Sequence, residues 1–101
     1  MPKQALRSAL AQADIEDALA CYLVEAPHMA GAFVNALEGA VTHIERAPGT
    51  GSLRYAHELD MPGLRFWGLR KFPYSVFYLE FEHHLLVTRL VHMSRDIPAS
   101  L

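Results

Sequence analysis

Apolar residues recur at intervals of three and four in two successive stretches of the chain's first half, which predicts two helices. The first is expected to begin with Asp14 as its N-cap and to stop near Pro27, which disfavours helical backbone in the preceding residue. A second helix should follow at once, because proline is tolerated in a first turn, and should end in the glycine-rich segment 47–52. The expected buried positions are Ile15, Leu19, Tyr22, Leu23 and Ala26, then Met29, Phe33, Leu37, Val41 and Ile44. The pattern predicts a helical hairpin with a nearly direct link.

The last third of the chain is rich in β-branched and aromatic residues. Residues 64–71, 72–82 and 85–93 are expected to be strands, with short breaks between them. Strands joined by such short links must pair antiparallel, since a parallel partner needs a crossover of about a dozen residues. The sequence Met-Pro-Gly at 61–63 is typical of a tight turn, and Gly68 indicates a bulge or a close backbone approach. The result is a three-stranded meander.

Composition bounds the class of protein. With about half of its 101 residues apolar and a fifth charged, the chain is expected to form one domain, residues 1–101. No apolar run reaches the roughly 18–20 residues needed to cross a bilayer, and no secretory signal is visible, which favours a cytoplasmic protein. A lone Cys21, expected in the core, agrees with a reducing compartment. Adjacent His83 and His84 on a strand would point to opposite faces, so no metal site is expected.

Charge is distributed unevenly along the chain. Residues 1–60 carry four cations and eight carboxylates, whereas residues 61–101 carry five cations and three carboxylates. The basic half is the expected sheet, which suits a charged partner on that side of the protein. The overall charge of −2 falls well short of the basic excess of a dedicated nucleic-acid-binding protein, so strong direct binding of nucleic acid is not expected.

Several short motifs follow one another in a characteristic order. They are Asp14-Ile15-Glu16-Asp17, Phe33-x-x-Ala36-Leu37, Pro48-Gly49, Gly63-Leu64-Arg65, Tyr74-x-Val76-Phe77-Tyr78 and Arg89-Leu90-Val91-His92-Met93-Ser94-Arg95-Asp96-Ile97-Pro98. Together with the hairpin and the meander, they resemble the RelE/ParE superfamily of bacterial toxins, most closely its ParE branch. The resemblance covers the chain from about residue 12 to its end. Two positions depart from it, because Leu79 stands where arginine is frequent and Met93-Ser94 replaces a small Gly-Ala pair.

The resemblance implies an α+β fold, with a helical hairpin packed on a three- to four-stranded antiparallel sheet that includes a short N-terminal edge strand. Residues 4–8 would form that strand. Local composition disagrees, since residues 3–12 are rich in helix formers and would extend the first helix back to about residue 4. We expect the strand, because pairing within a sheet overrides local propensity.

The resemblance also implies a function. A ParE-type toxin belongs to a type II toxin-antitoxin system, and a cognate antitoxin neutralises it by adding a helix in a groove or a strand at a sheet edge. ParE-like toxins resemble inhibitors of DNA gyrase that act by protein contact with no chemistry of their own, and their associated roles are growth arrest and plasmid stabilisation. No cofactor is implied. The expected target-binding residues are Arg65, Trp67, Arg70, Lys71 and Arg95, because Arg and Trp often carry interface energy.

Two other functions remain open. A RelE-like, ribosome-dependent mRNA endoribonuclease would need cations for the RNA backbone and a general acid or base. Its catalytic set would be Arg70, Lys71, Arg89 and His92, with Tyr74 or Tyr78 as further proton donors. That function predicts that the cations and the histidine converge on one cleft. The other alternative is a non-toxic binding module of the same fold, which Leu79 and the overall negative charge favour. Whatever the function, two residues also have a structural alternative: Arg89 would pair with Glu80 across the hairpin, and Trp67 would be a partly buried sheet aromatic.

Overall fold

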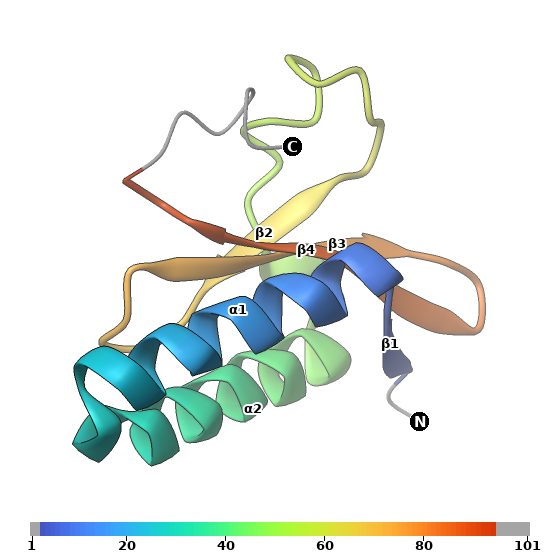
Figure 1. The fold of residues 1–101 in the computed structure, drawn as a ribbon. Helices are drawn as coiled ribbons and strands as arrows, with labels where there is room; N and C mark the ends of the chain where they lie inside the picture. The colour runs from blue at the N-terminus through green and yellow to red at the C-terminus, as the bar shows by residue number, and fades with distance from the viewer. Residues whose placement is uncertain (1–2, 95–101) are drawn as a thin grey trace.

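A computed structural model describes residues 3–94. The elements are β1 (Gln4–Arg7), α1 (Ala9–Glu25), α2 (Ala30–Arg46), β2 (Arg65–Gly68), β3 (Tyr74–Glu80) and β4 (His84–His92), with 3-10 turns at Pro27–Met29 and Pro48–Thr50. The strands form one sheet in the order β1-β4-β3-β2. Both helices lie side by side against one face of this sheet (Figure 1). The expected α+β architecture, a helical hairpin on a sheet with a short N-terminal edge strand, is confirmed.

The N-terminal strand forms despite its helical composition, because it has partners on both sides. β1 pairs in parallel with β4, placing Gln4 opposite His84 and Arg7 opposite Val87, so the sheet is mixed rather than wholly antiparallel. The N–H of Ala5 donates to the carboxylate of Glu45 on α2 at 2.8 Å. Pairing with distant elements therefore overrides the local propensity of this segment.

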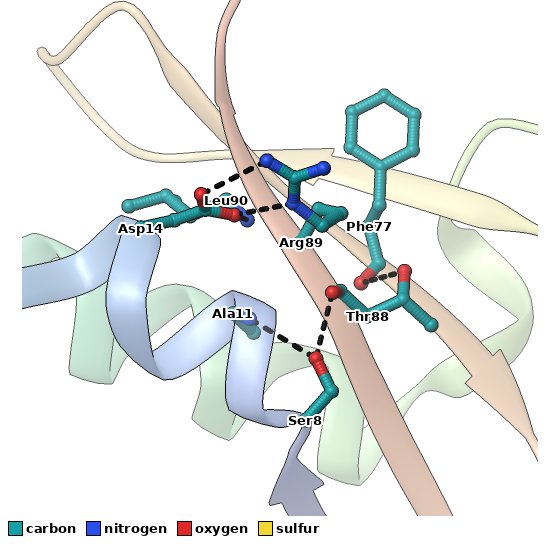
Figure 2. A network of polar contacts seen from close by, with 7 residues as sticks. All are labelled: Ser8, Ala11, Asp14, Phe77, Thr88, Arg89 and Leu90. Atoms are coloured by element: carbon teal, nitrogen blue, oxygen red, sulfur yellow. Dashed lines mark hydrogen bonds and ion pairs between the residues drawn. The ribbon is translucent and has the colours of Figure 1, made fainter. Parts of the chain in front are cut away.

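The first helix begins at Ala9, so the predicted N-cap at Asp14 is wrong. Ser8 is the N-cap: its backbone is extended, and its hydroxyl oxygen accepts a hydrogen bond from the N–H of Ala11 at 3.0 Å. The same hydroxyl donates to the carbonyl oxygen of Thr88 at 2.8 Å (Figure 2). One side chain thus starts α1 and fastens it to β4, which leaves Asp14 within the helix and available for another contact.

The main core lies between the helices and the sheet. Its fully buried members are Phe33, Ile44, Val76, Tyr78, Leu85 and Val87. Cys21, Leu23 and Met29, all expected in the core, are exposed instead. On α1 the buried positions repeat as Ala11, Ile15 and Ala18, so residues 21 and 23 project to either side of that stripe, and Met29 precedes α2 in a 3-10 turn. Within residues 3–94, no helix has the length and apolar character required to cross a bilayer.

A second cluster covers the opposite face of the sheet. Leu64, Phe77 and Val91 are buried there beneath residues 53–64, a loop that rises on the side away from the helices (Figure 1). The loop ends in the predicted tight turn: the N–H of Leu64 donates to the carbonyl oxygen of Met61 at 3.1 Å, and Gly63 has a φ of +82°. This is the glycine geometry of a type II turn, and it launches β2.

The bulge lies in β4 rather than at Gly68. Tyr78 lies opposite Val87 but Phe77 lies opposite Arg89, so Thr88 is the extra residue of β4. Gly68 simply ends β2, and a Cβ atom there would meet only the hydroxyl of Ser75 at 3.6 Å. The predicted irregularity at Gly68 is therefore wrong. The bulge changes which side chains of β4 reach the helices, and it brings Arg89 to the end of β1.

Candidate functional site

Beyond the end of β1, a carboxylate from α1 occupies the edge of β4. Oδ2 of Asp14 accepts hydrogen bonds from Nε of Arg89 at 2.7 Å and from the N–H of Leu90 at 3.0 Å. Oδ1 accepts from Nη2 of Arg89 at 3.0 Å, so the pair is bidentate (Figure 2). The side chains of Arg89 and Asp14 are only 25% and 18% exposed. Asp14 thus accepts the backbone hydrogen bond of Leu90, which lies beyond the end of the pairing between β1 and β4. The same carboxylate also binds Arg89.

This contact holds the Arg89 guanidinium in a fixed place against α1. Hydrogen bonding to Asp14 raises the pKa of the Arg89 guanidinium, against an opposing effect of burial. The predicted pair with Glu80 is wrong, because the hairpin register places Glu80 opposite Leu85, and its carboxylate accepts instead from Nζ of Lys3 at 3.0 Å. Arg89 therefore positions β4 against α1.

His92 lies at a different place, in a shallow cavity of about 180 Å³ between α1 and the end of the hairpin. Its ring meets that of Tyr74 edge-on at 5.0 Å. The N–H of Ser94 donates to Nδ1 of His92 at 3.2 Å, which leaves the ring proton on Nε2. The lining residues are Asp14, Asp17, Ala18, Cys21, Tyr74, Leu90 and His92. Among the described residues no lysine or arginine lines this cavity, so it offers nothing to hold an RNA phosphate.

Two of the predicted target-binding residues, Trp67 and Arg70, line a groove of about 520 Å³ between α2 and β2. Trp67 is half-buried there and stacks on His43, with ring centroids 4.0 Å apart and planes 11° apart. Nε2 of His43 donates to the hydroxyl of Thr50 at 2.9 Å, because that hydroxyl donates in turn to the carbonyl of Ala47. The lining residues are Asn35, Ala36, Gly39, Ala40, His43, Trp67, Gly68 and Arg70.

Two neighbouring cations follow β2, and the first of them, Arg70, lines this groove. Arg70 and Lys71 are both exposed in the connection from β2 to β3, and neither forms an ion pair within residues 3–94. Lys71 has a φ of +67°, the left-handed region where a side chain costs about 1 kcal/mol or more relative to glycine. Strain retained at a residue without a structural partner is a reason to look for function there.

The side chain of Arg65, unlike those of Arg70 and Lys71, is held by a hydrogen bond within residues 3–94. It is half-buried, and its Nη1 donates to the carbonyl oxygen of Gly51 at 2.8 Å. The N–H of Gly51 donates to the hydroxyl of Tyr78 at 3.2 Å, and that hydroxyl donates to the carbonyl oxygen of Pro48 at 2.6 Å. Burial raises the pKa of Tyr78, so it stays neutral. Arg65 and Tyr78 thus hold the end of α2 against the sheet.

The structure therefore divides the predicted residues into separate groups. Trp67 and Arg70 share the groove, with Lys71 next in the chain, while Arg65 is held by a backbone carbonyl. Arg95 lies outside the described residues. The ribonuclease set does not converge on one cleft, because Arg70 and His92 line different cavities and Arg89 is bound to Asp14. In residues 3–94 no cluster of three or more His, Cys, Asp or Glu side chains could hold a metal ion.

Sequence reasoning took Asp14 for a helix N-cap rather than for the partner of Arg89, and it assigned no role to His43. The absence of a basic residue within four positions of Asp14 means only that any ion pair it forms lies elsewhere in the chain, and Asp17 shares this feature but forms none within residues 3–94. His43 carried no signal either, since the tryptophan that it stacks on is 24 residues away.

Comparison with known proteins agrees with this architecture. The family model described as the ParE toxin of the type II toxin-antitoxin system, parDE, matches residues 6–97. A solved structure described as the chromosomal ParDE TA system from P. aeruginosa is similar in fold, with a TM-score of 0.73 and 20% sequence identity over 89% of this chain and 95% of that one. No curated protein matches the chain.

Proposed function

Because this chain belongs to the ParE toxin family of type II toxin-antitoxin systems, we propose that it arrests growth in the cytoplasm by inhibiting DNA gyrase through protein contact. One observation carries this proposal. Arg70 and Lys71 are exposed and form no ion pair within residues 3–94; Arg70 lines a groove with an aromatic floor, whereas His92, the candidate acid-base group, lines a different cavity. Such a surface suits binding, whereas cleavage of RNA needs cations and an acid or base at one point.

A cognate antitoxin would neutralise the protein by covering α1. This helix is in the core on one side, yet it exposes Leu10, Leu23 and Val24 on the other, and Val24 is 81% exposed. Apolar side chains on the open face of a helix favour a partner that buries them. The solved structure that this chain resembles is described as a ParDE toxin-antitoxin system, which supports an antitoxin for this chain too.

The proposed function is tested with the purified chain, freed of any co-expressed partner, in gyrase supercoiling and cleavage assays. We expect loss of supercoiling and accumulation of linear DNA with gyrase covalently attached, and restoration when the antitoxin is added back. A double variant, Arg70→Glu with Lys71→Glu, should lose this effect. Arg54→Glu is the matched control, because Arg54 is equally exposed but lies on the 53–64 loop, over the ring of Tyr55.

Absence of any effect on gyrase at high molar excess would overturn the proposal. Ribosome-dependent cleavage of mRNA by the same preparation would then favour the endoribonuclease, and it should depend on Arg70 and His92 together. A chain that binds its antitoxin, yet neither inhibits gyrase nor arrests growth when expressed alone, would be a non-toxic binding module.

A further inference from the structure

We propose that the groove between α2 and β2 binds an extended, acidic segment of the target protein, which adds to the sheet at the outer edge of β2. This inference rests on the proposed function, because it assigns the contact with the target to one surface. Three independent features support it: an open strand edge, an aromatic floor, and two exposed cations, Arg70 in the groove and Lys71 next to it in the chain, that form no ion pair within residues 3–94.

The strand edge is open at one residue. Ser52 pairs with the outer side of β2, since its N–H donates to the carbonyl of Phe66 and its carbonyl accepts from the N–H of Phe66, both at 3.0 Å. Backbone groups of alternate strand residues point the same way, so Gly68 also directs its N–H and carbonyl outward. Among the described residues, no segment continues this pairing at Gly68. Gly68 is exposed and has no side chain to obstruct an incoming strand.

The floor of the groove suits an extended chain. Gly39 leaves space on the α2 side, because a Cβ atom built there would have no neighbour within 4 Å. Trp67 and His43 form a flat stacked pair, and the hydrogen bond from His43 to Thr50 fixes the orientation of the imidazole. A side chain of the incoming segment would lie on this pair while its backbone pairs with Gly68. Main-chain hydrogen bonds and a side-chain pocket are the two components of recognition by strand addition.

Charge identifies the partner as acidic. Arg70 lines the groove and Lys71 follows it, and neither has an ion pair within residues 3–94. Gly68 lies only two residues before Arg70, so a carboxylate one or two positions beyond the paired residue of the partner would meet these cations. A charge contact at the end of a paired strand would fix the register and direction of the partner.

The first test uses a synthetic peptide and does not depend on gyrase. Trp67 is the only tryptophan in the chain, so its fluorescence reports directly on the groove. We expect a saturable change on titration with a blocked octapeptide of alternating valine and glutamate, and at least about tenfold weaker binding of the valine-lysine counterpart. No saturable change with the acidic peptide, or equal binding of both peptides, would overturn the inference.

The second test uses a pair of matched glycine variants of α2. Gly39→Leu fills the groove, whereas Gly31→Leu adds the same side chain outside it, and neither Cβ would have a neighbour within 4 Å. Both changes replace a glycine inside a helix, which should stabilise the helix. We expect Gly39→Leu to weaken peptide binding and gyrase inhibition at least about tenfold, and Gly31→Leu to leave both unchanged. Equal melting temperatures and retained antitoxin binding would show that both variants are folded.

The outcomes separate this inference from the proposed function. If the natural chain and Gly31→Leu trap gyrase but Gly39→Leu does not, both are supported. If Gly39→Leu traps gyrase as well as the natural chain, the groove is not the contact and this inference fails while the proposed function stands. If the acidic peptide binds in the groove but gyrase is unaffected by the natural chain, the proposed function fails, and the groove is a docking site for a different acidic partner.

Discussion

The cations near β4 and those that follow β2 have opposite environments. On the β4 side, Arg89 is three-quarters withdrawn from water and makes two hydrogen bonds to Asp14. On the β2 side, Arg70 and Lys71 are exposed, and no carboxylate within residues 3–94 pairs with them. All three residues belong to the basic half of the chain, and all three were members of the alternative ribonuclease set. The comparison shows that the fold, by placing α1 against β4, commits one cation to a structural ion pair and leaves the other two exposed to solvent.

Among the substitutions considered, removal of the Asp14 carboxylate should cause the largest loss of stability, because it removes hydrogen bonds that join α1 to β4. Asp14→Ala removes the carboxylate that accepts hydrogen bonds from the Arg89 side chain and from the N–H of Leu90 at a mostly buried site. We expect a loss of about 2 kcal/mol in the free energy of unfolding, or roughly 10 °C in melting temperature. Calorimetry or thermal denaturation followed by circular dichroism measures this.

Asp17→Ala is the control for that variant, because Asp17 lines the same cavity but is exposed and has no ion pair in the described chain. Its melting temperature should stay within about 2 °C of the natural protein. If the two variants have the same melting temperature, the contact of Asp14 with Arg89 does not stabilise the fold. Arg89 would then differ from Arg70 and Lys71 only in its exposure to solvent.

Tyr78→Phe should have the next largest effect, on the β2 side. The hydroxyl of Tyr78 is buried, donates to the carbonyl of Pro48 and accepts from the N–H of Gly51. Its loss should cost about 1.5 kcal/mol of unfolding free energy, because a buried carbonyl and a buried N–H lose their partner. Tyr55→Phe should cost less than about 0.5 kcal/mol, since no hydrogen bond of the Tyr55 hydroxyl exists within residues 3–94. Equal losses in chemical denaturation would contradict the assigned role of Tyr78.

Those features that depend on local signals were predictable from the sequence. The break at Pro27, the end of the second helix near Pro48 and the turn at Gly63 follow from backbone restrictions that proline and glycine carry anywhere. The start of the first helix was not predictable in this way. Residues 4–7 become a strand only because β4 and Glu45 lie beside them, and that proximity exists only in the folded chain.

The sequence indicated which residues could contact a partner, but not which of them lie together in the fold. Sequence reasoning selected Arg65, Trp67, Arg70, Lys71 and Arg95 for target binding, and of these Trp67 and Arg70 line one groove. It placed Arg89 with Arg70 and Lys71 in the alternative ribonuclease set. The extra residue in β4 and the end of β1 at Arg7 together place Arg89 within reach of Asp14. Neither a one-residue bulge nor the end of a strand leaves a periodic trace in the sequence, so the partner of Arg89 had to come from the structure.

Arg89→Lys keeps the positive charge at this position but removes the bidentate hydrogen bonding to Asp14. A lysine ammonium cannot reproduce the parallel contacts that Nε and Nη2 of Arg89 make with the two oxygens of Asp14. We expect a loss of about 1 kcal/mol, intermediate between the natural chain and Asp14→Ala. Arg54→Lys is the control, and its unfolding free energy in urea should not change. A loss as large as that of Asp14→Ala would mean that the bidentate geometry, rather than the charge, stabilises this side.

Lys71→Gly should produce the smallest change in stability and the clearest separation of stability from function. Glycine relieves the left-handed backbone at φ +67° but increases the entropy of the unfolded chain, so the expected net gain is about 0.5 kcal/mol. Asp60→Gly is the matched control, because Asp60 is also exposed with a positive φ, 52°, but lies on the 53–64 loop. Both variants should melt slightly higher, while only Lys71→Gly should bind the acidic peptide more weakly. That result would mean that Lys71 contributes to binding of the acidic peptide although its backbone conformation lowers the stability of the protein. Unchanged peptide binding in Lys71→Gly would instead assign the charge contribution to Arg70 alone.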